Sequence, residues 1–227
     1  MDRAYGLIFD VDGVIADTER VNAEASIKVF EDLFGVRGVV RSDFEAGLGR
    51  GAAEYVRAAA RIHGVELEDG QVEAATLARQ EYFIAMLKAQ PLPAFPGVLE
   101  LMDSALVRDD FRVGIATSST REKSEAVLKS AQVFYGQMAY VTGSDVTKKK
   151  PDPELFLKAA ELLGLPPERC VVVEDAPDGV AAAKAAGCRC VAVTNSARAD
   201  RLSDADCIVE SLMELDLDQL SGLIDKK

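Results

Sequence analysis

The stretch LIFDVDGVIADT, residues 7–18, decides the fold class of this chain. It opens with a short apolar run typical of a buried parallel strand, and the run ends in two carboxylates, Asp10 and Asp12, followed by Gly13. Alternate side chains of an extended backbone point to the same face, so both aspartates are expected on one side of the strand's carboxyl end. Carboxylates this close destabilise one another unless a cation or a shared proton compensates them, and a hard, oxygen-seeking cation such as Mg²⁺ is the simplest solution. The alternative is a turn in which Asp and Gly only end the strand.

Composition and charge exclude several classes of partner. A net charge of −12 argues against nucleic-acid binding, which relies on a basic surface that neutralises phosphates. No apolar run approaches the roughly 18–20 residues needed to span a bilayer, and the start of the chain does not resemble a signal peptide. The four cysteines lie beside apolar runs and are expected to be free, buried thiols. We therefore expect a cytoplasmic monomer with neither a nucleic-acid nor a membrane partner.

The single histidine, His63, narrows the chemistry further. It lies at a probable helix end between Ile62 and Gly64, a poor position for a catalytic or metal-binding group. Ser-His-Asp hydrolysis and histidine-rich metal sites are therefore disfavoured. Catalysis by this chain would have to rest on carboxylates, hydroxyls and lysine.

Hydrophobic periodicity divides the chain into two parts. After the opening strand, helices are expected at 19–34, 52–62 and 71–88, the first with an apolar face made of Val21, Ala25, Val29, Phe30 and Leu33. Beyond the proline-rich segment 91–97, strands at 112–116, 138–142, 171–173, 190–193 and 207–209 alternate with helices at 98–106, 121–131, 153–163 and 178–186. This alternation predicts an α/β fold with a doubly wound parallel sheet. We expect a core domain of residues 1–18 and 93–227 and an inserted helical cap domain of residues 19–92; the alternative is a helical bundle packed permanently into one core.

Polar residues follow the predicted strands at the point where each strand ends. Thr117-Ser118-Ser119 follows 112–116, and Glu174-Asp175 follows the strand that contains Val171–Val173. Past strand 138–142, Lys148-Lys149-Lys150 precedes a Pro-Asp-Pro sequence that opens a helix. The carboxyl ends of the strands form the ligand crevice of a doubly wound sheet, so these groups should meet there with Asp10 and Asp12.

This set of groups suits phosphoryl transfer. Paired carboxylates can bind Mg²⁺, a hydroxyl and a lysine can bind phosphate oxygens, and an aspartate can attack phosphorus. Two of the segments have a simpler interpretation when taken alone, whereas Glu174-Asp175 after three valines is harder to explain without a cation. Thr117-Ser118-Ser119 could contain the N-cap of the next helix, and the lysine run could be a solvated loop in which one member matters. The four segments together favour the catalytic interpretation.

In this order the motifs resemble the phosphatase branch of the haloacid dehalogenase superfamily, and within it the β-phosphoglucomutase-like group with a helical cap. The resemblance implies that Asp10 is the nucleophile and Asp12 the general acid/base, whose backbone carbonyl also binds Mg²⁺. It assigns Thr117 to the hydroxyl motif, Lys150 to the motif lysine and Glu174-Asp175 to the metal-binding acids. Dehalogenases of this fold lack the second aspartate, so dehalogenation is not expected.

The resemblance extends to the predicted cap. The segment Gly47–Gly51 resembles the family's specificity loop, in which Arg50 would meet the distal part of the substrate. Arg79 falls where mutase-like members carry a basic residue, with a solvated surface side chain as the alternative, and Asn22 stands where β-phosphoglucomutase has a histidine. With Lys150, the residues Thr117, Ser118 and Ser119 complete the expected substrate site.

These features predict a Mg²⁺-dependent phosphatase of a small phosphorylated metabolite, a sugar phosphate, that acts through an aspartyl-phosphate on Asp10. One alternative is a phosphosugar mutase of the β-phosphoglucomutase type, although the replacement of its histidine by Asn22 weakens that assignment. The other is a non-catalytic metabolite-binding protein, for which loss of Asp10 or Lys150 would have been the signature.

Overall fold

A computed structural model of the chain describes residues 4–47 and 51–226. The strands are β1 (Tyr5–Phe9), β2 (Phe111–Ala116), β3 (Ala139–Val141), β4 (Cys170–Glu174), β5 (Arg189–Val193) and β6 (Cys207–Val209). The α-helices are α1 (Thr18–Phe34), α2 (Ala52–Ile62), α3 (Asp69–Ala89), α4 (Val98–Leu106), α5 (Arg121–Ser130), α6 (Glu154–Leu163), α7 (Pro177–Ala186) and α8 (Leu217–Asp225). Short 3₁₀ segments are η1 (Arg41–Gly47), η2 (Tyr135–Gln137), η3 (Pro167–Arg169), η4 (Ala199–Arg201) and η5 (Leu212–Glu214).

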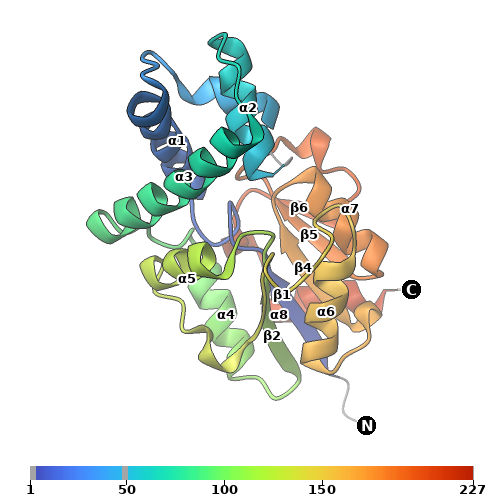
Figure 1. Cartoon of the computed structure of the whole chain (residues 1–227). Helices are drawn as coiled ribbons and strands as arrows, with labels where there is room; N and C mark the ends of the chain where they lie inside the picture. The colour runs from blue at the N-terminus through green and yellow to red at the C-terminus, as the bar shows by residue number, and fades with distance from the viewer. Residues whose placement is uncertain (1–3, 48–50, 227) are drawn as a thin grey trace. The chain divides into compact units, whose positions relative to one another are not determined.

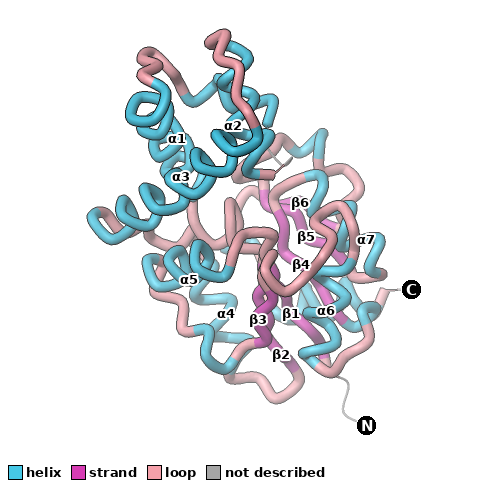
Figure 2. The backbone as a smooth tube through the Cα atoms, viewed as in Figure 1, coloured by secondary structure: helices cyan, strands magenta, loops and turns pink. Residues whose placement is uncertain are grey.

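The chain divides into two compact units, Met1–Asp17 with Leu92–Lys227, and Thr18–Pro91. The first, here called the core unit, contains the sheet, and the second, the helical unit, contains α1, η1, α2 and α3 (Figures 1 and 2). The boundaries differ by one residue from those expected from the sequence. No helix among the described residues is long and apolar enough to cross a membrane.

The six strands form one parallel sheet in the order β3-β2-β1-β4-β5-β6. The chain therefore builds outward from β1 in one direction through β2 and β3, and in the other through β4, β5 and β6. Strands that run parallel need a crossover connection, and the helices between them supply it. This arrangement confirms the predicted doubly wound α/β fold.

Both faces of the sheet are covered, which explains the unbroken apolar runs of its central strands. Every residue of β1 and β4 is buried. Ile8, Val172 and Ala192 point to the face where α6 and α7 pack, in a core that also contains Leu155 and Val180. Helices α4 and α8 pack together and contact β2 and β4, respectively. A strand buried on both faces loses the polar alternation of a half-exposed strand, as these sequences do.

The helical unit has a separate aromatic core. Phe30 of α1, Phe44 of η1 and Tyr55 of α2 are buried together, and the rings of Phe44 and Tyr55 stack with centroids 4.8 Å apart. Helix α1 packs along α3. The predicted apolar face of α1 is confirmed for Val29 and Phe30 but is wrong for Leu33, which is 47% exposed because the last turn of the helix presents Phe34 to this core instead.

Every helix and strand expected from the sequence is confirmed in type, with boundaries within about two residues. Helix α8 was not expected. It carries Gly222 in its middle and only nine residues, which weakens its periodic signal. A capping box of Asp216 and Gln219 at its N-terminus is the local signal that could have revealed it.

Candidate active site

The candidate site lies where the strand order reverses. Strand β1 pairs with β2 on one side and with β4 on the other, and connections leave these two strands in opposite directions along the sheet. Asp10 directly follows β1, and its backbone N–H donates to the carbonyl of Val173 in β4 at 3.0 Å. Glu174 is the last residue of β4. Ligands of doubly wound sheets bind at such a switch point, outside the carboxyl ends of the strands.

Three carboxylates and one ammonium group converge there. Oxygen atoms of Asp10, Glu174 and Asp175 lie within 4.8 Å of one another, and all three residues are buried. We call these three residues the carboxylate cluster. Lys150 Nζ donates to Asp10 Oδ1 at 2.6 Å and also to Glu174 Oε1. The side chains of Asp10 and Lys150 are only 8% and 12% exposed, so this ion pair is largely removed from solvent.

The electrostatics of the cluster favour a bound cation. Burial raises the pKa of Asp10 to about 7, and Glu174 and Asp12 add to this effect while Lys150 opposes it. Burial, Glu174 and Asp10 likewise raise the pKa of Asp175 well above its ordinary value. Burial disfavours the charge on Lys150, but Asp10 and Glu174 outweigh it and raise the pKa of the lysine. The cluster therefore carries more negative charge than one lysine balances.

The donor set fits a hard divalent cation. Closely spaced carboxylate oxygens are the ligands that Mg²⁺ prefers. With Asp12 and its lysine partner Lys123 included, four carboxylates face two ammonium groups at this edge of the sheet. When all four carboxylates are ionised, the excess of two negative charges equals the charge of one magnesium ion. Asp10 and Asp175 are the side chains best placed to bind it, since both oxygens of Glu174 already accept hydrogen bonds, one from Lys150 and the other from backbone N–H groups.

Two glycines make room for the cluster. The Glu174 carboxylate accepts from the N–H groups of Asp175 at 3.0 Å and Ala176 at 3.2 Å, where α7 begins, and a Cβ on Gly179 would lie 2.0 Å from it. Gly13 has a φ of +81°, and a Cβ there would lie 1.8 Å from Asp175 Oδ2. The roles of Gly13 and Gly179 follow from contacts with the carboxylates of Asp175 and Glu174, so sequence reasoning missed them. A glycine directly after Asp10-Val11-Asp12 was the available signal.

Alternation along a strand does not place Asp10 and Asp12, because β1 ends before both of them; that the two side chains share one side stays a prediction. Strand β1 ends at Phe9, and the chain turns through Val11, whose carbonyl accepts from the N–H of Ile15 at 2.9 Å. Strand alternation therefore does not apply to residues 10–12, and the side chain of Val11 is buried. The Asp12 carboxylate does not join the carboxylate cluster. The magnesium ligand implied for this residue is its backbone carbonyl, and that role stays a prediction.

The Asp12 carboxylate has its own partners. Ser119 Oγ donates to Asp12 Oδ2 at 2.6 Å, and Lys123 Nζ donates to Asp12 Oδ1 at 2.9 Å. Sequence reasoning missed Lys123, which lies in the first turn of α5. Two features of its position in the sequence pointed toward the site. Lys123 closely follows the Thr117–Ser119 segment, and it lies in the first turn of a helix, where the helix dipole disfavours a basic residue.

The hydroxyl segment between β2 and α5 is not the helix cap. The N-cap of α5 is Thr120, whose side chain accepts from the N–H of Lys123 at 3.3 Å. Thr117 is buried, and its Oγ1 accepts from the N–H of Ser119 at 3.1 Å. Ser118 Oγ is shielded from solvent and has no hydrogen-bond partner among the described residues. The three residues before the cap are therefore placed by the strand end and not by the needs of the helix.

Of the three lysines in the run, Lys150 alone contacts the cluster. Lys148 is exposed and lies 3.5 Å from Asp152, and Lys149 is also exposed. The carboxylate of Glu154 accepts from the N–H groups of Thr147 at 3.0 Å and Lys148 at 2.8 Å, which orders the loop before α6. The interpretation of the first two lysines as solvated thus agrees with their exposure.

The remaining predicted residues belong to the helical unit. Asn22 is half-buried in α1, and its backbone carbonyl accepts from Ser26 Oγ at 2.7 Å. Arg79 of α3 is half-buried, with its guanidinium carbon 5.1 Å from the ring centroid of Tyr55. Arg50 lies outside the described residues. The roles of these three residues stay predictions.

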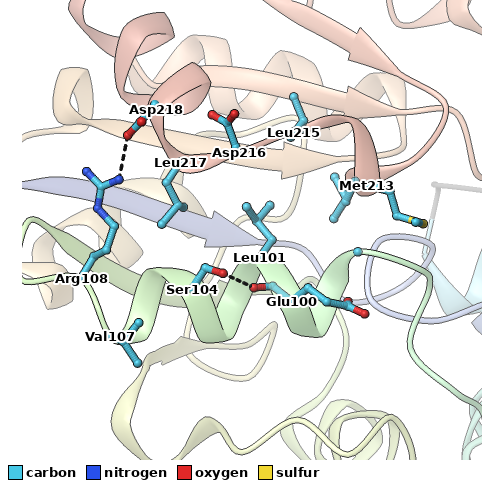
Figure 3. Close-up of a pocket in the computed structure, with 12 residues that line it drawn as sticks. Glu100, Leu101, Ser104, Val107, Arg108, Met213, Leu215, Asp216, Leu217 and Asp218 are labelled. Carbon is cyan, nitrogen blue, oxygen red and sulfur yellow. Dashed lines mark hydrogen bonds and ion pairs between the residues drawn. The ribbon is translucent and has the colours of Figure 1, made fainter.

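A groove of about 600 Å³ lies elsewhere in the core unit (Figure 3). It runs between α4 and the segment from η5 to α8, with Leu101 and Leu217 facing it from the two sides. Arg108 Nη1 donates to Asp218 Oδ1 at 2.7 Å, and Ser104 Oγ donates to the carbonyl of Glu100 at 2.6 Å. None of the predicted site residues lines this groove, so size alone does not mark the candidate site.

Comparison with known proteins agrees with this geometry. Residues 6–187 match the family of haloacid dehalogenase-like hydrolases. The chain is 31% identical over 214 residues to hexitol phosphatase A of Escherichia coli, with 94% of each chain covered. It is 34% identical over 208 residues to protein SUPPRESSOR OF QUENCHING 1, chloroplastic, of Arabidopsis thaliana. That match covers 89% of this chain but spans only 19% of the length of the plant protein.

A solved structure of CbbY from Rhodobacter sphaeroides, a point mutant in complex with xylulose-(1,5)-bisphosphate, has a TM-score of 0.83 to this chain at 27% identity. The alignment covers 93% of this chain and 96% of CbbY. Sequence motifs, sheet topology and relatives thus agree. The chain belongs to the haloacid dehalogenase-like hydrolases, among the phosphatases of the β-phosphoglucomutase-like group.

Proposed function

We propose that this chain is a Mg²⁺-dependent phosphatase of a small sugar phosphate, with Asp10 as the nucleophile and Asp12 as the general acid/base. The observation that carries the proposal is the buried Asp10–Lys150–Glu174 arrangement with Asp175 beside it, at the switch point of the sheet. Purely structural use of three neighbouring buried carboxylates is unfavourable, because burial and mutual repulsion both disfavour their ionised forms.

In the first step Asp10 would attack phosphorus. The bond between an Asp10 carboxylate oxygen and phosphorus forms while the bond from phosphorus to the ester oxygen of the sugar breaks. The departing alkoxide takes a proton from Asp12 and leaves as the sugar hydroxyl. Lys150, 2.6 Å from Asp10 Oδ1, orients the attacking carboxylate and offsets charge that develops on the phosphoryl oxygens.

In the second step water would attack the aspartyl-phosphate. Asp12 accepts a proton from this water as its oxygen bonds to phosphorus, and the bond from phosphorus to the Asp10 oxygen breaks. Asp10 is regenerated as a carboxylate and inorganic phosphate leaves. The Thr117 hydroxyl and the Ser118 hydroxyl, which lacks a partner among the described residues, are candidate donors to phosphoryl oxygens.

Asp10, Asp175 and the backbone carbonyl of Asp12 would bind the magnesium ion, with Glu174 beside them. A bound Mg²⁺ supplies positive charge that lowers the repulsion between a carboxylate nucleophile and an anionic phosphate ester. It would also offset the burial penalty that raises the pKa values of Asp10 and Asp175.

The substrate class is supported by the relatives. One is named as a phosphatase of hexitol phosphates, and CbbY was solved with a ketopentose bisphosphate. We propose that the helical unit is the cap, and that Arg50 and Arg79, with Asn22, recognise the part of the substrate remote from the transferred phosphate. Both arginines would suit a second phosphate or an anionic sugar.

The proposal is tested by phosphate release from a panel of hexitol phosphates, hexose phosphates and xylulose 1,5-bisphosphate, with Mg²⁺ and with a chelator. We expect release from at least one sugar phosphate that stops on chelation and returns when Mg²⁺ is added. β-Glucose 1-phosphate with a bisphosphate primer is included, and glucose 6-phosphate is followed together with free phosphate. Glucose 6-phosphate that forms much faster than phosphate would assign a mutase. Tight binding without release from any ester would assign a non-catalytic binding protein.

A further inference from the structure

Lys123 is a basic residue in direct contact with the proposed general acid/base, and none of the expected motifs includes it. Its Nζ donates to Asp12 Oδ1 at 2.9 Å and to Ser119 Oγ at 3.3 Å. Ser119 Oγ donates in turn to Asp12 Oδ2 at 2.6 Å. The two oxygens of the Asp12 carboxylate therefore each have a donor, and both donors come from the short segment between the end of β2 and the first turn of α5.

This pair differs from an ordinary surface ion pair. The side chain of Lys123 is 13% exposed and that of Asp12 is 28% exposed. By contrast, Lys129 on the same helix pairs with Glu125 at 3.7 Å and is 70% exposed. Exposed pairs of the second kind contribute little to stability, whereas removing a lysine from water is costly unless its charge is compensated.

The structure of α5 does not explain the position of this lysine. The helix is capped by the side chain of Thr120, which accepts from the backbone N–H of Lys123. A lysine in the first turn is disfavoured by the helix dipole, which prefers acidic residues there. The Lys123 side chain instead contacts Asp12 and Ser119, at the edge of the sheet where the carboxylate cluster lies.

We infer that Lys123 is a positioning residue for Asp12: with Ser119 it keeps the Asp12 carboxylate out of the carboxylate cluster. Asp12 is separated from Asp10 by one residue, and its charge contributes to the field at Asp10. Without Lys123 and Ser119, the carboxylate would turn toward the cation and Lys150, which attract it. There it would bind a cation or lysine instead of exchanging protons with the ester oxygen and with water.

The inference rests on the proposed function and makes a specific kinetic prediction. Departure of a sugar alkoxide needs a proton from Asp12, whereas p-nitrophenolate leaves without one. Lys123→Met retains the apolar stem of the side chain and removes its charge. We expect this variant to lower kcat/KM for the sugar phosphate by about 10- to 100-fold, and for p-nitrophenyl phosphate by less than about 3-fold. The ratio kcat/KM is the right measure because it reports transfer to Asp10 and not the later hydrolysis.

Three further variants keep the test independent of folding defects. Ser119→Ala removes the donor to the other Asp12 oxygen and should lower kcat/KM more for the sugar phosphate than for the aryl ester, whereas Lys129→Ala should change neither substrate. Lys123→Arg restores a cationic donor and should be more active on the sugar phosphate than Lys123→Met. A crystal structure of Lys123→Met should show the Asp12 carboxylate displaced from Ser119.

The outcomes separate the two proposals. Equal losses on the sugar and aryl esters, or no loss on either, would overturn the positioning role while leaving the phosphatase assignment intact. A wild-type protein that releases phosphate from neither ester would overturn both. Selective loss in Lys123→Met and Ser119→Ala, with partial recovery in Lys123→Arg, would support the role of Lys123.

Discussion

Asp10 and Asp12 are separated by one residue, yet their carboxylates lie in different surroundings. Asp10 is 8% exposed, is paired with the buried Lys150, and has two further acids within reach of a shared cation. Asp12 is 28% exposed and is paired with Lys123 and a serine hydroxyl. Two aspartates of one short motif can thus take different chemical roles, because the turn after β1 sends their side chains to different partners.

The two aspartates also differ in the charged groups that surround them. The Asp10 region has an excess of negative charge that a divalent cation would compensate, and burial raises the pKa of Asp10 to about 7. The Asp12 carboxylate has one lysine of its own and contact with solvent. A nucleophile must stay ionised, whereas a general acid/base must exchange its proton with water between steps. The difference in surroundings suits that division of roles.

The largest effect is expected from Asp10→Asn, because an amide cannot serve as the attacking anion. Turnover of the best sugar phosphate should fall on the order of 10⁵-fold or more, as when a covalent nucleophile is removed. Steady-state phosphate release measures this, with beryllium fluoride binding to the wild-type protein and not to the variant as a second readout. Near-normal turnover by purified Asp10→Asn would end the covalent mechanism and, with it, the contrast between the two aspartates.

The second largest effect is expected from Lys150→Ala, which removes the lysine paired with Asp10. Lys150→Ala removes the ammonium group that contacts Asp10 and Glu174, so kcat should fall about 10²- to 10³-fold on sugar and aryl phosphates alike. This uniform loss contrasts with the selective loss expected for Lys123→Met. Lys149→Ala, in the same loop but exposed, is the control and should keep wild-type activity. If Lys150→Ala affected only the sugar phosphate, the two lysines would not have separate roles.

Sequence reasoning could predict the Asp10 side of the site but not the whole Asp12 side. Asp10, Lys150 and the Glu174-Asp175 pair each stand at the end of a strand or before a helix, and the parallel sheet brings such positions to one edge. The partner of Asp12 depends on where β1 ends and how the chain turns through Val11, which alternation along a strand does not predict. The helix periodicity of α5 likewise gives no reason for Lys123 to turn toward the sheet.

The glycines beside the carboxylate cluster likewise could not be assigned a role from the sequence alone. A glycine in the first turn of α7 looks unfavourable for a helix until the Glu174 carboxylate is seen beside it, 2.0 Å from where a Cβ of Gly179 would lie. Local sequence thus predicts which elements form and which polar groups reach the sheet edge. Contacts between elements decide which of those groups pair.

A third prediction concerns the cation itself. Asp175→Ala removes one hard oxygen ligand and one negative charge from the cluster, so Mg²⁺ should bind about 10- to 100-fold more weakly. Titration calorimetry of the metal-free protein with Mg²⁺ measures this directly, without substrate. Asp178→Ala, an exposed carboxylate in the first turn of α7, is the control. Equal Mg²⁺ affinity in Asp175→Ala and wild type would contradict the metal assignment while leaving Asp10 as a candidate nucleophile.

The smallest effect on turnover is expected from a third aspartate–lysine pair, which tests whether pairing with lysine marks a chemical role at all. Asp206 accepts from Lys184 Nζ at 2.6 Å and from the backbone N–H of Cys190 at 2.8 Å, beside the pair formed by β5 and the edge strand β6. Burial disfavours its charge, but Lys184 and the Cys190 N–H outweigh this and lower its pKa.

An acid with a lowered pKa in the folded state stabilises the fold above its unfolded-state pKa, and this contribution is lost as pH falls through the folded-state value. Asp206→Asn should therefore reduce the free energy of unfolding by about 2 kcal/mol at neutral pH, a fall in Tm of about 4–8 °C, and the difference from wild type should shrink in acid. Thermal unfolding from pH 7 to pH 3 measures this. Phosphate release below the Tm should stay close to wild type, because Asp206 holds strands together and contacts neither the cluster nor Asp12. If the folded Asp206→Asn variant lost most of its turnover, contacts alone would not separate a structural aspartate–lysine pair from the pairs formed by Asp10 and Asp12.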